Sequence, residues 1–230
     1  MWHRWEIADI ALFVILRRSG HLQMRKVALL QTKRLYSREI DVPDLERADF
    51  EIGIGRIADR TDPLRPISTQ RKFTFDDDCA YGAVRAGDHQ IEAINSYFEE
   101  QGIPIYYGFY NPTALPYSAM YPASDGTAPM AKNAVGFRVS PSTAVHDAVS
   151  KLQAGHAPSP NDLRLRPAID PGDSDSERGW RLERFVADEV LRCRQGRLFE
   201  DASDARLRNL LYARSAPIQS AISITIDQAD

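Results

Sequence analysis

Three polar residues lie at the ends of two apolar runs in the N-terminal part of the chain. Asp9 opens the run DIALFVILRR, and Gln31 and Lys33 follow the apolar residues of MRKVALLQTKRLY at 24–36. Both runs are rich in β-branched and long apolar side chains, which is typical of buried strands. Carboxylate and amide oxygens are ligands for a hard divalent cation such as Mg²⁺. A nearby lysine orients an attacking water or stabilises charge that develops on phosphorus oxygens, so these residue types suit phosphodiester hydrolysis.

The residues SGH at 19–21 predict a tight turn, and the two runs therefore form a β-hairpin. If the chain turns around Gly20, Asp9 lies opposite Gln31, with Cβ atoms about 5 Å apart. Because side chains alternate between the faces of a strand, Gln31 and Lys33 share a face. We therefore expect Asp9, Gln31 and Lys33 to converge, with the Thr32 backbone carbonyl as a further oxygen ligand.

The stretch ADIALFVILRRSGHLQMRKVALLQTKRLY resembles the metal-binding hairpin of the PD-(D/E)XK nuclease superfamily. That hairpin carries an Asp and, on the next strand, (Glu/Gln)-x-Lys, and the Gln form is typical of the Mrr-like restriction endonuclease branch. The resemblance implies that Asp9, Gln31 and Lys33 are catalytic and that Asp9, Gln31 and the Thr32 carbonyl hold Mg²⁺, or Mn²⁺ in its place. It also implies a helix and a further strand after the hairpin, with Gln90 on that helix reaching the site.

The superfamily core usually opens with a helix that precedes the Asp strand and often carries an acidic residue. Here eight residues precede Asp9, and Glu6 is the accessory acidic candidate among them. Two functions therefore stay open. The first is a Mg²⁺-dependent nuclease that cleaves DNA in restriction or defence. The second is a catalytically impaired nuclease-like fold that binds nucleic acid or serves as a subunit of an assembly.

A structural alternative stands beside both functions. Asp9 would then cap a strand edge, Gln31 and Lys33 would be ordinary solvated residues, and the cations would protect the sheet edge against aggregation.

Positive charge is concentrated at the N-terminal end of the chain. Residues 1–38 contain eight Lys or Arg and two Asp or Glu, a net charge of +6 in a chain whose total is −3. Such a local basic segment is a footprint for a polyanion, although a solvated hairpin with ordinary surface charges is the alternative. The residues expected to contact nucleic acid are Arg17, Arg18, Arg25, Lys26 and Arg34.

The remaining patterns predict an α/β protein. Residues 87–102 read as a helix that Asp88 caps and Gly102 ends, and residues 103–112 follow at once as an aromatic strand. Further expected elements are a strand at 136–140, a helix at 140–153, a helix at 180–195 and a strand at 221–227. Residues 37–75 read as a long polar excursion with room for short helices, and residues 113–135 read as a loop.

The expected fold is a restriction-endonuclease-like mixed central sheet flanked by helices, with a long C-terminal extension. Its parts are a nuclease-like core at 1–153, a flexible Pro-, Asp- and Ser-rich loop or linker at 154–179, and a helix and strand at 180–230 that pack on the core.

Composition and motifs limit the other classes. Hydrophobic residues at 43% and charged residues at 27% indicate a soluble globular chain, and without a membrane span or secretory signal we expect a cytoplasmic location. The expected partner is nucleic acid, in the form of DNA, and no interaction with a membrane is expected. The chain is also expected to form a homo-oligomer or to bind a partner in a defence system. The chain has no HExxH, GxSxG or GxxxxGK[ST] motif, which removes the usual zinc-hydrolase, serine-hydrolase and P-loop signatures.

Three minor features have simpler explanations. Cys79 and Cys193 are expected to be buried free thiols. The acidic run at 76–78 is a second metal candidate but reads more simply as a solvated turn. The aromatic strand at 106–110 could stack on bases, although core packing accounts for it.

Overall fold

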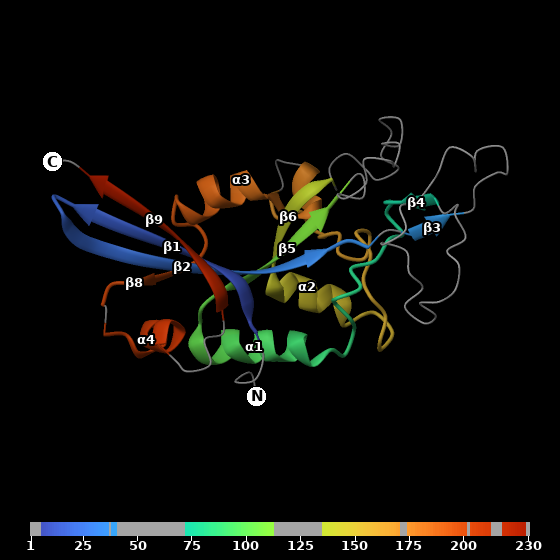
Figure 1. Cartoon of the computed structure of the whole chain (residues 1–230), viewed down its shortest axis with the longest axis horizontal. Coiled ribbons are helices and arrows are strands. Elements are labelled where there is room, and N and C mark those ends of the chain that lie inside the picture. Colours follow the sequence, from blue (N-terminus) through green and yellow to red (C-terminus); the bar gives the residue numbers. More distant parts are fainter. Residues whose placement is uncertain are drawn as a thin grey trace, which may run out of the picture.

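The computed structural model describes residues 6–36, 38–40, 72–112, 135–170, 174–201, 203–212 and 218–228. Most of the excursion expected at 37–75 and of the loop expected at 113–135 lies outside these ranges. The described part is an α/β structure built on a mixed seven-stranded sheet, whose main path runs in the order β7-β6-β5-β2-β1-β9 (Figure 1). β8 pairs with β2 off this path, and β3 and β4 form a separate two-stranded sheet.

The long hairpin expected from the sequence is present. β1 (Ala8–Arg18) and β2 (His21–Arg34) pair antiparallel. Ser19 and Gly20 connect them with φ angles of 48° and 76°, the left-handed conformation that a two-residue hairpin turn requires. The pair Ile10–Leu30 sets the register at the open end, so Asp9 and Gln31 are the next residues opposite one another.

The next elements also follow the expected order. α1 (His89–Gln101) begins after Asp88, whose side chain accepts from the Gln90 N–H, and ends at Gly102 in the left-handed conformation. β5 (Ile105–Asn111) then runs parallel to β2, and β6 (Gly136–Pro141) pairs antiparallel with β5.

The C-terminal half completes the sheet. α2 (Ser142–Val149) is shorter than the helix expected at 140–153, because the chain leaves it in turns. The other elements are β3 (Arg38–Ile40), β4 (Lys72–Thr74), a 3₁₀ helix (Ser174–Arg178), β7 (Trp180–Arg181), α3 (Leu182–Arg184), a π-helix (Phe185–Val190), β8 (Arg197–Phe199), α4 (Ala205–Tyr212) and β9 (Ile218–Gln228). β9 runs parallel to β1 and forms one end of the sheet.

Two hydrophobic clusters cover the two faces of the sheet. Val27 and Leu29 pack with side chains of α1, α2 and α4 in one cluster. Ala28 and Leu30 face the other way and pack with Trp180 and the π-helix in the second. The helices therefore form layers on both faces of the sheet, α1, α2 and α4 on one and α3 on the other (Figure 1).

Two expectations about the C-terminal half need correction. The helix expected from Trp180 begins as a strand, since Trp180 and Arg181 pair with β6, and the helical residues that follow change from α to π geometry. Trp180 is buried against Tyr106 and Phe185, which fixes this extended start. The described part of the segment at 154–179 lacks long elements but is packed, because Leu163 is in the core and the Tyr81 N–H donates to the Pro158 carbonyl.

Candidate active site at the open end of the hairpin

The Asp9 carboxylate lies at the centre of a polar cluster where the hairpin strands begin and end. Its Oδ1 accepts from the Gln31 side-chain amide at 3.2 Å, and its Oδ2 accepts from both the N–H and the hydroxyl of Thr32. Gln31 is buried, with 3% of its surface exposed. The register that the sequence predicts therefore brings Asp9 and Gln31 into direct contact.

Lys33 joins this cluster from the same strand face as Gln31. Val27 and Leu29 point toward α1. Because side chains alternate along a strand, Gln31 and Lys33 point the same way. The Lys33 ammonium donates to Gln90 Oε1 at 2.8 Å, at the start of α1. Gln90, expected as an accessory residue, thus contacts the lysine directly.

Glu6 is the other accessory candidate, and two elements hold it beside the site. The Gln90 side-chain amide donates to the Glu6 backbone carbonyl at 3.2 Å. From β9, the Gln219 amide donates to Glu6 Oε2 at 2.6 Å, and the Ser220 hydroxyl donates to the Asp9 backbone carbonyl at 2.8 Å. Sequence reasoning missed Gln219 and Ser220, which lie just before the strand expected at 221–227. Only the parallel pairing of β9 with β1 brings them to the site.

The two carboxyl groups of the cluster share a hydrogen bond and have opposite pKa shifts. The hydrogen bond with Asp9, and burial after it, raise the pKa of Glu6. Burial acts to raise the pKa of Asp9, but hydrogen bonds from Glu6 and Thr32 and the charge of Lys33 outweigh burial and lower this pKa. Where a proton lies between the two carboxyl groups, Glu6 is therefore favoured over Asp9 as its holder.

Lys33 is perturbed as well. Burial lowers the pKa of its ammonium, while the negative charges of Asp9, Asp88 and Glu6 oppose that shift. A partly buried lysine next to an ionised carboxylate is the kind of group that reactive sites contain.

Two oxygen atoms of the cluster fit a cation. Gln31 Oε1 and Glu6 Oε1 are buried and lack a hydrogen-bond partner, and both residues contact Asp9. Buried oxygens are normally hydrogen-bonded, so these two are suited to bind a hard ion. No group of three His, Cys, Asp or Glu side chains suited to a metal occurs in the described ranges. A cation here would therefore depend on amide and carbonyl oxygens and on water in addition to the two carboxyl groups of Asp9 and Glu6. The Thr32 carbonyl remains a predicted ligand.

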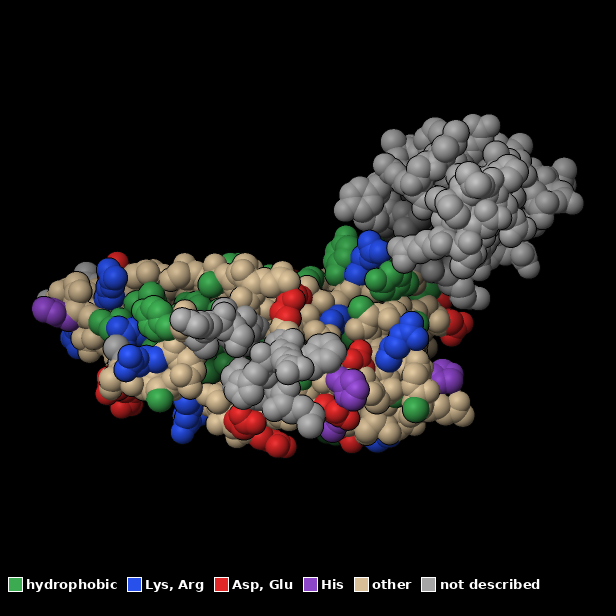
Figure 2. All heavy atoms as spheres, turned by 60° about the horizontal axis from the view of Figure 1, so that its bottom comes forward, with side chains coloured by type: hydrophobic (Ala, Val, Ile, Leu, Met, Phe, Trp, Pro, Cys, Tyr) green, Lys and Arg blue, Asp and Glu red, His purple; other side chains and the backbone are tan. Residues whose placement is uncertain are grey.

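The predicted nucleic-acid contacts divide into exposed and buried residues. Arg17 and Arg18 are exposed, and Arg25 is half-buried, near the hairpin tip, the end of the molecule at the left of Figure 2. Arg34 is exposed at the other end of β2, with its guanidinium 5.0 Å from the centre of the Tyr36 ring.

The prediction for Lys26 is wrong. Its side chain is 1% exposed, and its ammonium donates to the Val190 carbonyl at 2.6 Å, so it cannot reach a phosphate. Lys26 shares a strand face with Ala28 and Leu30, and the π-helix covers that face.

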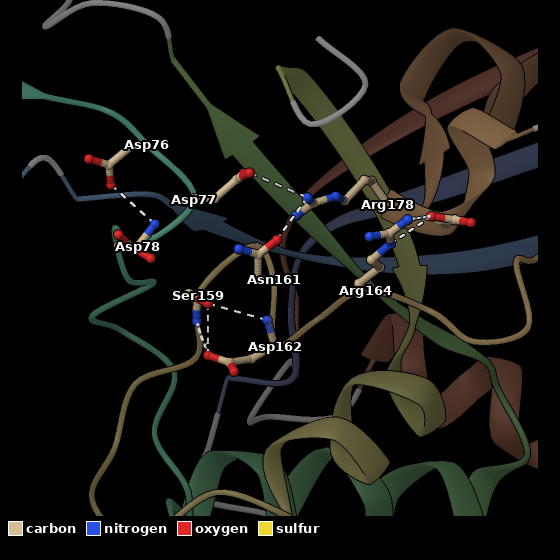
Figure 3. Close-up of polar contacts among 9 residues, drawn as sticks. Asp76, Asp77, Asp78, Ser159, Asn161, Asp162, Arg164 and Arg178 are labelled. Atoms are coloured by element: carbon tan, nitrogen blue, oxygen red, sulfur yellow. Dashed lines mark hydrogen bonds and ion pairs between the residues drawn. The ribbon is translucent and has the colours of Figure 1, made fainter. Parts of the chain in front are cut away.

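The acidic run at 76–78 forms a turn held by its own contacts. Asp76 accepts from the Asp78 N–H, and Asp77 faces the Arg178 guanidinium at 3.6 Å (Figure 3). Arg178 also donates to Asn161 at 2.9 Å, so this run ties the loop before α1 to the segment at 154–179. These contacts agree with the simpler reading of a turn.

The aromatic strand and the cysteines have structural positions. Tyr106, Tyr107 and Phe109 of β5 are in the core, as core packing requires, and Tyr110 is 42% exposed. Neither cysteine forms a disulfide: Cys79 is buried as expected, whereas Cys193 is exposed, contrary to expectation. Cys193 follows the π-helix at a positive φ of 59°, where the chain turns toward β8.

Comparison with known families, with curated protein sequences and with solved structures gives no match for this chain. Within the described ranges, no helix has the length and apolar character needed to cross a membrane.

Proposed function

We propose that this chain is a divalent-cation-dependent nuclease that hydrolyses phosphodiester bonds of DNA, in restriction or defence. The observation that carries the proposal is the convergence of Asp9, Gln31 and Lys33 at one end of a buried hairpin. Gln90 and Glu6 complete the group. We further propose that this α/β fold is restriction-endonuclease-like. The order of its elements supports this: the hairpin of β1 and β2 is followed by α1 and then by β5, which runs parallel to β2.

In this proposal each side chain has one task. Asp9, Gln31 and Glu6 would hold Mg²⁺ or Mn²⁺, which when bound polarises the phosphate and lowers the pKa of a water molecule. Thr32 fixes the Asp9 carboxylate through its N–H and hydroxyl. Gln90 holds the Lys33 ammonium beside Asp9, where it can stabilise the charge that grows on the phosphate oxygens.

The alternative is a catalytically impaired fold that binds nucleic acid. One observation favours it: both oxygens of Asp9 already accept hydrogen bonds from Gln31 and Thr32. Binding of a cation must compete with these donors.

A cleavage assay distinguishes the two functions. Supercoiled plasmid and single-stranded DNA are incubated with the full chain and Mg²⁺, Mn²⁺ or a chelator. The nuclease proposal requires cation-dependent cleavage that Asp9→Ala and Lys33→Ala both remove. Asp147→Ala and Lys151→Ala serve as matched controls, because these residues form an exposed ion pair on α2 and the turn after it. Activity equal in all four variants would indicate a contaminating nuclease, and no activity with either cation would favour the binding function.

A further inference from the structure

β9 is an edge strand without the usual protection of an edge. It pairs with β1 on one side only, and none of the strands in the described ranges pairs with its other side. Every residue of its 11 is exposed except Ile218, Ile224 and Ile226, which are partly buried. A strand of this length leaves a row of main-chain N–H and C=O groups open to a further strand.

Most of β9 lacks the residues that block strand addition. From Ile218 to Ile226 it reads IQSAISITI, with no charged residue and no proline, and Asp227 near its end is the one charged residue of the strand. Edge strands are normally guarded by charges, prolines, bulges or short length. β7, at the opposite end of the main path, is two residues long and is guarded in that way.

An apolar stripe runs along one face of this edge. Ile222, Ile224 and Ile226 lie level with Leu12, Val14 and Leu16 of β1, so they continue the face that packs against the π-helix. Ile222 is nevertheless 50% exposed. The sheet therefore ends in an apolar row that a further strand would cover.

We propose that β9 pairs antiparallel with β9 of a second copy of this chain, across a two-fold axis at Ile224. Opposite residues of an antiparallel pair point to the same face, so each Ile222 would meet Ile226 of the second copy and the two Ile224 side chains would meet each other. Asp227 would lie opposite Ala221, and no like charges would face one another. The partner that matches this stripe is the same stripe in a second copy, because the stripe is uncharged and Ile222 and Ile226 are evenly spaced on either side of Ile224.

Two-fold pairing also closes the assembly. Each copy has one β9 edge, so the seam consumes both edges and leaves the short β7 strands at the ends of a continuous sheet. The proposal is independent of nuclease activity, although the same strand carries Gln219 and Ser220, which contact the candidate active site.

The test is the oligomeric state of the full chain, measured by sedimentation over a wide range of protein concentrations. The wild type should dimerise and Ile224→Lys should be monomeric, because two ammonium groups would face each other at the axis. The matched control is Leu22→Lys, which places the same charge on a side chain that is 40% exposed near the hairpin tip. It should remain dimeric, and circular dichroism should show all three proteins folded. A monomeric wild type, or a dimer that survives Ile224→Lys, overturns the proposal.

A second measurement tests the register and does not need the lysine variant to fold. In a Cys193→Ser background, Ile224→Cys should form a covalent dimer on mild oxidation, since residues opposite each other at the axis have Cβ atoms close enough for a disulfide. Gln228→Cys, on the same exposed strand, should form no covalent dimer, because its two copies lie far from each other across the axis. Equal crosslinking of the two variants overturns the proposed register.

Discussion

Lys33 and Gln90 are 57 positions apart in the sequence, yet the Lys33 ammonium donates a 2.8 Å hydrogen bond to Gln90 Oε1. The contact joins the second hairpin strand to the first turn of α1. It places the ammonium at the end of the hairpin where Asp9 contacts Gln31. The lysine is therefore held by the protein beside the candidate active site, where the proposed function has it act on a bound phosphate.

Lys33→Ala and Asp9→Ala should both abolish cleavage but differ in binding. The lysine contributes mainly when charge develops on the phosphate, so Lys33→Ala should lower the cleavage rate by about a hundredfold or more and leave DNA binding largely intact. Asp9→Ala removes a proposed cation ligand and should also weaken Mg²⁺ binding. Single-turnover cleavage, DNA binding and calorimetric Mg²⁺ titration measure the three quantities. Equal loss of Mg²⁺ binding in both variants would contradict these roles.

Gln31→Glu should retain or raise cleavage activity. The change puts a carboxylate at the position where the resembling superfamily has Glu or Gln, and it strengthens the negative charge available to Mg²⁺. Mg²⁺ affinity and cleavage rate are compared with those of Gln31→Ala, which should lose both. A glutamate variant as inactive as the alanine variant would show that Gln31 does not bind the cation.

Gln219→Ala should weaken the site although Gln219 lies outside the hairpin. Its amide holds Glu6 Oε2, and removal of such an outer partner typically lowers metal affinity or activity about 10–100-fold. Gln219→Glu should be worse, because it removes the donor and adds a like charge beside Glu6. Gln228→Ala, an exposed glutamine at the other end of β9, is the matched control and should behave as wild type. Mg²⁺ titration gives a readout separate from cleavage.

The hairpin and its polar end could be predicted because both depend on local sequence. A tight turn at Ser19–Gly20 and the two-residue period fix which side chains meet, so the contact of Asp9 with Gln31 follows from counting residues. The cap at Asp88 and the stop at Gly102 likewise fixed α1, and with it Gln90.

The contribution of β9 could not be predicted in this way. Gln219 and Glu6 are 213 positions apart, and no sequence pattern specifies that β9 adds parallel to β1. The same limit applies to Lys26, which looks like a surface cation in a basic segment. Its burial depends on the π-helix that lies 164 positions away at Val190.

The arginines near the hairpin tip should carry a salt-dependent part of DNA affinity. With Lys26 excluded by its burial, the variant to test is Arg17→Ala, Arg18→Ala and Arg25→Ala combined. Each lost phosphate contact should lower the dependence of log affinity on log salt by about 0.9. Arg208→Ala, exposed on α4, is the control. Affinity measured at several salt concentrations gives the slope, and an unchanged slope would locate DNA binding on another surface.

Lys26→Met should change how stability depends on pH. Burial lowers the pKa of Lys26, while Cys193 and Glu189 oppose the shift. The folded state therefore releases this proton at a lower pH than the unfolded state, whose lysine keeps its ordinary value of 10.5. Between these two pKa values the unfolded chain binds more protons, so the contribution of Lys26 to stability rises with pH in that range and is constant below it.

Methionine has a similar length and no charge, so the stability of the Lys26→Met variant lacks this rise. Unfolding free energies of wild type and Lys26→Met, measured by denaturant titration from neutral pH upward, should diverge in favour of the wild type. A constant difference across that range would show that the Lys26 ammonium is not destabilised by its burial.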